Sequence, residues 1–149
     1  ILRVFSRHSF ALICYVIVSA VFIVQGLVYY FSDQLMTYHM IILDTDWDYL
    51  SANSQHLILS FQKGGGIGAF STGILMLVIA LIPFRKNEQW AKWTLAAVGI
   101  AGITPLFLLT KSLNSVSGVL TPYPLVLALL IILIIGFLLS LQQDSTSHN

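Results

Sequence analysis

The chain has 149 residues, of which 57% are hydrophobic and only 9% are charged. Because a soluble domain carries about 25% charged residues, this composition excludes an ordinary soluble protein and indicates a membrane protein of one domain. A net charge of +1 offers no basic surface for nucleic acid. The single cysteine, Cys14, excludes an intrachain disulfide and a cysteine-based metal site.

Four apolar segments are each close to the ~20 residues that a helix needs to cross a bilayer core. They are continuous runs without alternation, so we expect helices rather than strands. The first is interpreted as an uncleaved membrane helix, because it is too long for the apolar part of a signal peptide. The predicted fold is therefore all-α, one antiparallel four-helix membrane bundle. The predicted spans are residues 10–31, 60–84, 90–110 and 123–141.

The connection between the first and second spans, residues 32–55, is too long for a tight hairpin. It contains an apolar stretch at residues 35–43, followed by Trp47 and Tyr49. We expect a short helix lying in the membrane interface here.

The second span opens with a cluster of glycines. Gly64 and Gly68 are four residues apart, and Gly65 begins a parallel row. Small residues at this spacing let membrane helices approach closely. The partner helix belongs to the same bundle, to a second copy or to another protein, or else the glycines leave room for a ligand. Gly64, Gly66 and Ala69 also match a dinucleotide-binding pattern, but no strand precedes them and the match is rejected.

The second span is expected to end at Pro83 and Phe84, before a polar turn at residues 85–89. In the third span, Lys92 is expected to extend its side chain to lipid headgroups. Pro105 is expected to kink the same helix. The fourth span is almost purely aliphatic.

The distribution of lysine and arginine predicts the orientation in the membrane. Basic residues favour the cytoplasmic side, which here holds both termini and the turn between the second and third spans. The loop at residues 32–55 is then extracytoplasmic, and the protein is predicted to be a multi-pass protein of the inner (plasma) membrane. The cytoplasmic basic residues are Arg3, Arg7, Arg85, Lys86 and Lys92, against Lys63 and Lys111 on the other side.

Lys63 is the charge of greatest interest, because it lies at the predicted outer boundary of the second span. It either extends to headgroups, or it pairs with Asp44, Asp46 or Asp48 of the outer loop or with an anionic ligand. His56 precedes Lys63 by two helical turns, so both share one face if the helix extends that far.

Two further polar residues are candidates for a site. His39 could join His56 and the loop carboxylates around a metal ion, but the spacing is not diagnostic and no metal is predicted. Gln25, inside the first span, is predicted to form a hydrogen bond to a neighbouring helix. Since Gln25, Lys63 and the glycines fall in the outer half of the bundle, any pocket is expected to open outward.

Several short motifs are spread along the chain: Tyr38-His39, Trp47, Gly64 to Gly66, Arg85-Lys86 and Trp90-Ala91-x-Trp93. Together they resemble the motifs of a family of small, uncharacterised bacterial four-helix membrane proteins. The resemblance covers most of the chain. It implies the four-helix fold but no activity, and it implies that His39 and the glycine cluster matter together.

No catalytic constellation and no cofactor motif is present in the sequence. The leading hypothesis is a non-enzymatic accessory or scaffold subunit, or a module that binds a lipid-like ligand, with membrane lipids and other transmembrane helices as partners. The alternative is an outward-facing lipid- or quinone-linked enzyme that uses His39, His56, Lys63 and the aspartates. A small transporter is a weaker alternative, because few polar groups lie within the spans.

Overall fold

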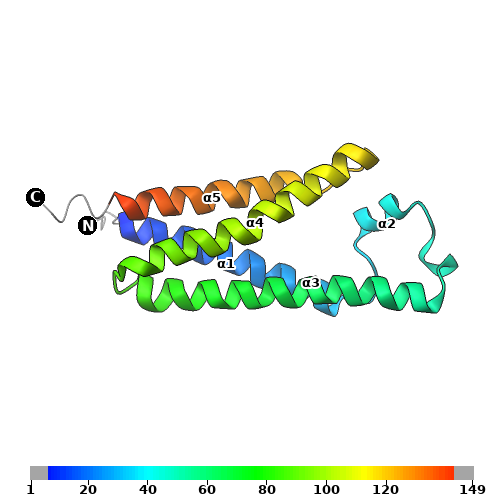
Figure 1. Cartoon of the computed structure of the whole chain (residues 1–149), viewed down its shortest axis with the longest axis horizontal. Coiled ribbons are helices and arrows are strands. Elements are labelled where there is room, and N and C mark those ends of the chain that lie inside the picture. The colour runs from blue at the N-terminus through cyan, green and yellow to red at the C-terminus, as the bar shows by residue number, and fades with distance from the viewer. Residues whose placement is uncertain (1–6, 143–149) are drawn as a thin grey trace, which may run out of the picture.

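A computed structural model of the chain describes residues 7–142. It confirms the expected all-α architecture, in which four long helices pack as an antiparallel bundle and a short helix lies between the first two (Figure 1). The elements in chain order are α1 (Arg7–Phe31), α2 (Thr37–Leu43), η1 (Trp47–Tyr49), α3 (Ala52–Ile79), η2 (Ala80–Phe84), α4 (Gln89–Ser117) and α5 (Tyr123–Leu141).

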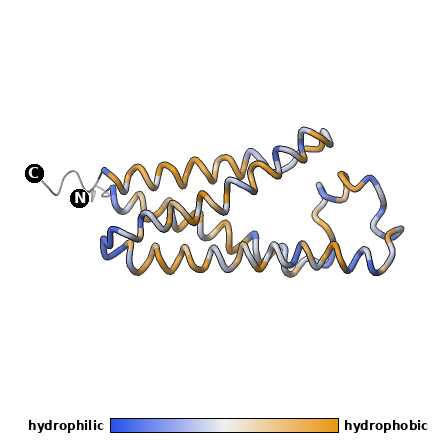
Figure 2. The backbone as a smooth tube through the Cα atoms, viewed as in Figure 1, coloured by the Kyte–Doolittle hydropathy of each residue, from blue (hydrophilic) through white to orange (hydrophobic). Residues whose placement is uncertain are grey.

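The bundle has two distinct ends. The first residues of α1, the last residues of α5 and the α3–α4 turn lie together at one end, called here the turn end (Figure 1). The opposite end carries α2 and η1 and is called the α2 end. Polar residues gather toward the two ends and apolar residues dominate between them (Figure 2). The four long helices are apolar enough to cross a membrane, so the chain is a multi-pass membrane protein.

The helix α3 begins well before the predicted span. Ser51 caps it by accepting a hydrogen bond from the N–H of Ser54 at 3.2 Å. Together, α3 and η2 comprise 33 residues, or about 50 Å at 1.5 Å per residue. Since a bilayer core is ~30 Å thick, the first turns of α3 extend beyond it. His56 therefore lies on the same continuous helix as Lys63.

The same helix ends where the sequence predicts. Pro83 has no N–H and its ring crowds the preceding turn, and the backbone responds by widening into the π-helical turn η2. The N–H of Arg85 accordingly donates to the carbonyl of Ala80 at 3.2 Å. This turn leads directly into the connection before α4.

The helix α4 continues through Pro105 and ends at Ser117, and it is capped by Gly118, whose positive φ of 69° suits glycine at this position. Thr121 then joins the two helices, because its hydroxyl donates to the carbonyl of Thr110 at 2.7 Å. Both threonines are buried, so this bond fixes how α4 and α5 meet at the α2 end.

The apolar core is made mainly by the first half of α1, the end of α3 and the first half of α4, together with α5. At the turn end, Phe84 stacks on His8 with ring centroids 4.7 Å apart and meets the edge of Tyr15 at 5.1 Å. The largest fully buried apolar side chains are Tyr15, Met76, Leu95, Ile103, Leu133 and Val18.

Lys92 corrects one expectation from the sequence. Its side chain is only 5% exposed rather than extended to headgroups. It follows the core-facing stripe of α4, in register with Leu95, Gly99 and Ile103, and this stripe turns it inward.

Candidate functional site

The α1–α3 contact depends on three glycines. A β-carbon on Gly26 would lie 2.5 Å from the backbone nitrogen of Phe70 and 2.7 Å from the carbonyl oxygen of Gly66. One on Gly73 would lie 2.8 Å from the carbonyl oxygen of Ser19. Any side chain at these positions would collide with backbone. The two helices therefore touch through Gly26, Gly66 and Gly73.

The glycines singled out by the GxxxG spacing occupy a different face of α3. Gly64, Gly65 and Gly68 are exposed, and β-carbons built on them meet no other described atom within 4 Å. They do not pack against another helix of this chain. The sequence suggested a helix of the same bundle, a helix of another chain, or a ligand as the partner of these glycines. The first is excluded within the described residues, and the other two remain.

Two of these glycines, Gly64 and Gly68, belong to a longer exposed seam along α3, defined by residues 61, 64, 68, 71 and 75. Phe61 is 74% exposed and Leu75 is 51% exposed, and the three other seam residues, Gly64, Gly68 and Ser71, are also exposed. The spacing alternates between three and four residues, which is the repeat by which two helices pair side by side. A large apolar residue therefore stands at each end of a seam whose centre is small: Gly64, Gly68 and Ser71.

A second feature lies on the neighbouring flank of α3. Because two glycines meet there, no side chain fills the space above the contact, and an apolar groove of about 300 Å³ remains. Its walls come from both helices, and Phe31, the most exposed of its aromatic rings, is 71% exposed. The lining residues are Gly26, Leu27, Tyr30, Phe31, Gly66, Ile67 and Phe70.

Lys63 lies one helical turn from this groove, toward the α2 end. It precedes Gly66 by three residues and Ile67 by four, so it projects from the same face of α3. The side chain is partly buried and forms no hydrogen bond or ion pair with any residue in the 7–142 range. The structure therefore contains no pairing of Lys63 with Asp44, Asp46 or Asp48.

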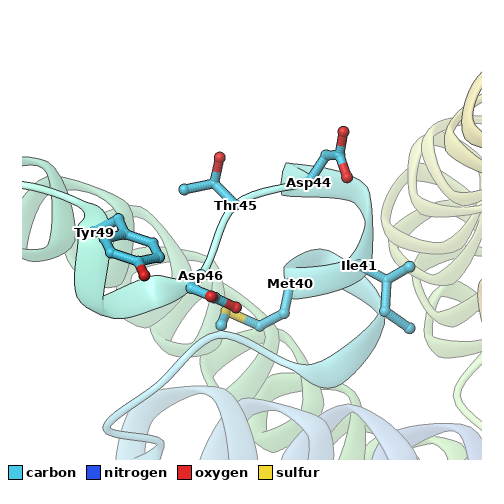
Figure 3. Close-up of a pocket in the computed structure, with 6 residues that line it drawn as sticks. All are labelled: Met40, Ile41, Asp44, Thr45, Asp46 and Tyr49. Atoms are coloured by element: carbon cyan, nitrogen blue, oxygen red, sulfur yellow. The ribbon is translucent and has the colours of Figure 1, made fainter.

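Two of the loop aspartates, Asp44 and Asp46, line a separate, open cavity of about 640 Å³ between α2 and η1 (Figure 3). Asp44 lies at the end of α2 with a positive φ of 51°, and Asp46 lines the same cavity. The cavity is not lined by His39, His56 or Lys63. The structure thus brings together only two of the polar groups that an outward-facing enzyme would need. The lining residues are Met40, Ile41, Asp44, Thr45, Asp46 and Tyr49.

His39 packs inside the α2 region instead. Its ring lies 4.0 Å from that of Tyr38, and its Nδ1 atom is buried with no hydrogen-bond partner. Burial lowers the pKa of His39 below its ordinary value. The hydroxyl of Tyr38 is hydrogen-bonded to that of Tyr29 at 2.7 Å, which ties α2 to the end of α1. Burial, followed by this hydrogen bond, raises the pKa of Tyr38.

The remaining candidates have simpler surroundings. His56 is exposed on α3. Gln25 is partly buried in α1, and its side chain forms no hydrogen bond with any described residue. Across residues 7–142, no three histidine, cysteine, aspartate or glutamate side chains are grouped closely enough to hold a metal ion.

Sequence reasoning missed the groove, because Gly26 carried no motif on its own. The available signal was the seven-residue spacing of Gly66 and Gly73, which places both on one face of a helix, together with a lone glycine in the first span. No family model, curated protein or solved structure matches the chain. The four long apolar helices agree with the fold implied by the family resemblance.

Proposed function

We propose that this multi-pass membrane protein is a non-enzymatic accessory subunit, which binds a transmembrane helix of another subunit along the α3 seam. The observation that carries the proposal is that the glycines occupy two different environments. Gly26, Gly66 and Gly73 serve contacts inside the bundle, whereas Gly64, Gly65 and Gly68 face open space. Small residues exposed on a membrane helix allow a second helix to approach closely.

Gln25 on α1 supports association with a helix outside the bundle, although at a different place from the seam. It is a polar side chain within a membrane span and has no hydrogen-bond partner among residues 7–142. A polar group in hydrocarbon favours a partner on an adjacent helix, with a contribution of about 1 kcal/mol. Because the seam faces away from α1, a helix on the seam does not reach Gln25, and its partner would be a second helix of the bound subunit.

The orientation with both termini in the cytoplasm belongs to the proposal, since it rests on the distribution of lysine and arginine. The α2 end then lies outside the plasma membrane. The enzyme alternative loses support, because the loop cavity contains Asp44 and Asp46 without His39, His56 or Lys63.

The proposal is tested by introducing a bulky residue into the seam. Gly68→Leu should abolish co-purification of the bound subunit in mild detergent, or energy transfer between two labelled copies if the subunit is a second copy. Ala128→Leu is the control, because it places the same leucine side chain at an exposed position on α5. Equal association of both variants and the wild type would rule out the seam as the binding face.

A further inference from the structure

The groove between α1 and α3 differs from the seam in depth, shape and charge. Its volume of about 300 Å³ is at the lower limit of the ~300–1,000 Å³ typical of ligand pockets. It suits one flexible chain rather than a helix. Its floor is the backbone contact of Gly26 with Gly66, and its walls are apolar and aromatic.

The depth of the groove follows from the length of α3. Counting back the ~20 residues of a membrane crossing from Phe84 reaches the region of Lys63 and Gly64. Gly66, Ile67 and Phe70 therefore lie just inside the hydrocarbon, and Lys63 lies at the level of the headgroups. The groove begins one turn below a cation and continues toward the membrane interior, the direction in which a lipid acyl chain extends.

The charge at the mouth of the groove selects among lipids. Lys63 has no acidic partner within the described part of the chain, and Asp44 and Asp46 line another cavity. A lysine carries a long apolar stem that can lie along Ile67 while its ammonium group remains in the headgroup layer. An ammonium group in that position attracts a phosphate that has no compensating positive charge.

We propose that the α1–α3 groove holds one acyl chain of an anionic phospholipid, with the phosphate of that lipid bound by Lys63. The site uses a different face of α3 from the seam, so it does not depend on the association of α3 with another helix. The aromatic rings of Tyr30 and Phe70 flank the chain. Gly26 and Gly66 have two roles: they allow the close contact of α1 with α3, and their lack of side chains leaves the groove unfilled.

The test uses the full chain reconstituted in phosphatidylcholine vesicles with trace amounts of spin-labelled phosphatidylglycerol or phosphatidylcholine. The fraction of immobilised label gives the relative affinity for each lipid. The wild type should prefer phosphatidylglycerol. Lys63→Gln should reduce that preference by roughly fivefold, the effect of one lysine near a membrane surface.

Two further variants separate the headgroup from the chain. Lys111→Gln is the matched charge control. Lys111 is an exposed lysine on α4, also toward the α2 end of the bundle, and it does not line the groove. Ile67→Trp should fill the groove and reduce immobilisation of both lipids without changing their ratio. If Ile67→Trp does not fold, Leu27→Trp places the same bulk in the groove from α1.

An unchanged lipid preference in Lys63→Gln would overturn the proposal. An equal loss in Lys63→Gln and Lys111→Gln would also overturn it, because it would reveal a general attraction of charge rather than a site. Retention of full immobilisation in the folded groove-filling variant would exclude the groove as the place where the chain binds.

Discussion

Gly26 of α1 and Gly66 of α3 approach so closely that a β-carbon on Gly66 would lie 2.8 Å from the carbonyl oxygen of Gly26. This contact determines the rotation of α3 about its own axis. With Gly66 turned toward α1, its neighbours Gly64, Gly65 and Gly68 are turned away from it. One close contact therefore creates both the exposed seam and the groove beside it.

The first prediction compares two adjacent glycines. Gly66→Ala should destabilise the protein by about 1–3 kcal/mol, because the new methyl group collides with backbone that cannot rearrange locally. Gly65→Ala is the control, since its methyl group meets open space. Thermal unfolding in mild detergent, followed by circular dichroism, measures both variants. Equal destabilisation would show that the α1–α3 contact differs from the one described.

A second prediction concerns the pH dependence of the α2 end. The pKa of His39 is lowered by burial in the fold, so the unfolded α2 region binds a proton more readily than the folded one. This stability is complete above the ordinary histidine pKa of about 6.5 and is lost as the pH falls through the lowered value. The protection of the Thr37–Leu43 amides against exchange with deuterium, relative to their intrinsic exchange rate at each pH, should therefore decrease in acid.

The control for this acid effect is His39→Gln, which cannot titrate. The ratio of exchange rates between wild type and variant cancels the intrinsic effect of pH on exchange. That ratio should rise as the pH falls below ~6.5. A ratio independent of pH would mean that titration of His39 is not coupled to the folding of α2.

A third prediction addresses the attachment of α2 to α1. Tyr38→Phe removes the hydrogen bond to Tyr29, whose oxygen atoms are 2.7 Å apart. The ring remains, so packing is preserved and the loss should be about 1 kcal/mol, confined to the α2 region. Hydrogen exchange should increase in α2 and stay constant in the core of α4. Increased exchange throughout the bundle would contradict this local role.

A fourth prediction concerns the junction of α4 with α5. Thr121→Val keeps the shape of the side chain but removes the buried hydrogen bond to the carbonyl of Thr110, at an expected cost of about 1 kcal/mol. Thr94→Val is the matched control, because its hydroxyl bonds only to Trp90 in its own helix. In denaturation experiments in mixed micelles, the unfolding midpoint of Thr121→Val should be lower than that of the wild type, and the midpoint of Thr94→Val should be unchanged.

The parts of the fold that could be predicted from the sequence are those that depend on local interactions. Composition and run length suffice for the four spans, and the ring of Pro83 ends α3 wherever that helix packs. The burial of Lys92 was not predicted, because it depends on which face of α4 packs against the other helices. That face, which Lys92 shares with Leu95 and Gly99, is known only from the packed structure.

The candidate site was harder to predict for the same reason. The sequence identified the glycine-rich region of α3, but four glycines lie within five positions and local spacing cannot tell which of them faces inward. That choice is made by Gly26, which is distant in the sequence and is seen only when α1 and α3 are placed together. The groove, which needs both helices, could not be inferred from either one.

The most direct test of the seam is site-specific photo-cross-linking along α3 in native membranes. A benzophenone probe is attached to single cysteines at Phe61, Leu75, Phe70 or Ile74, in a Cys14→Ala background, so that at the seam it replaces a side chain that is already large and exposed. Probes at Phe61 and Leu75 should yield one discrete protein adduct, and probes at Phe70 and Ile74 should yield lipid adducts only. Lipid adducts alone from all four positions, or equal protein adducts from all four, would contradict the proposed binding face.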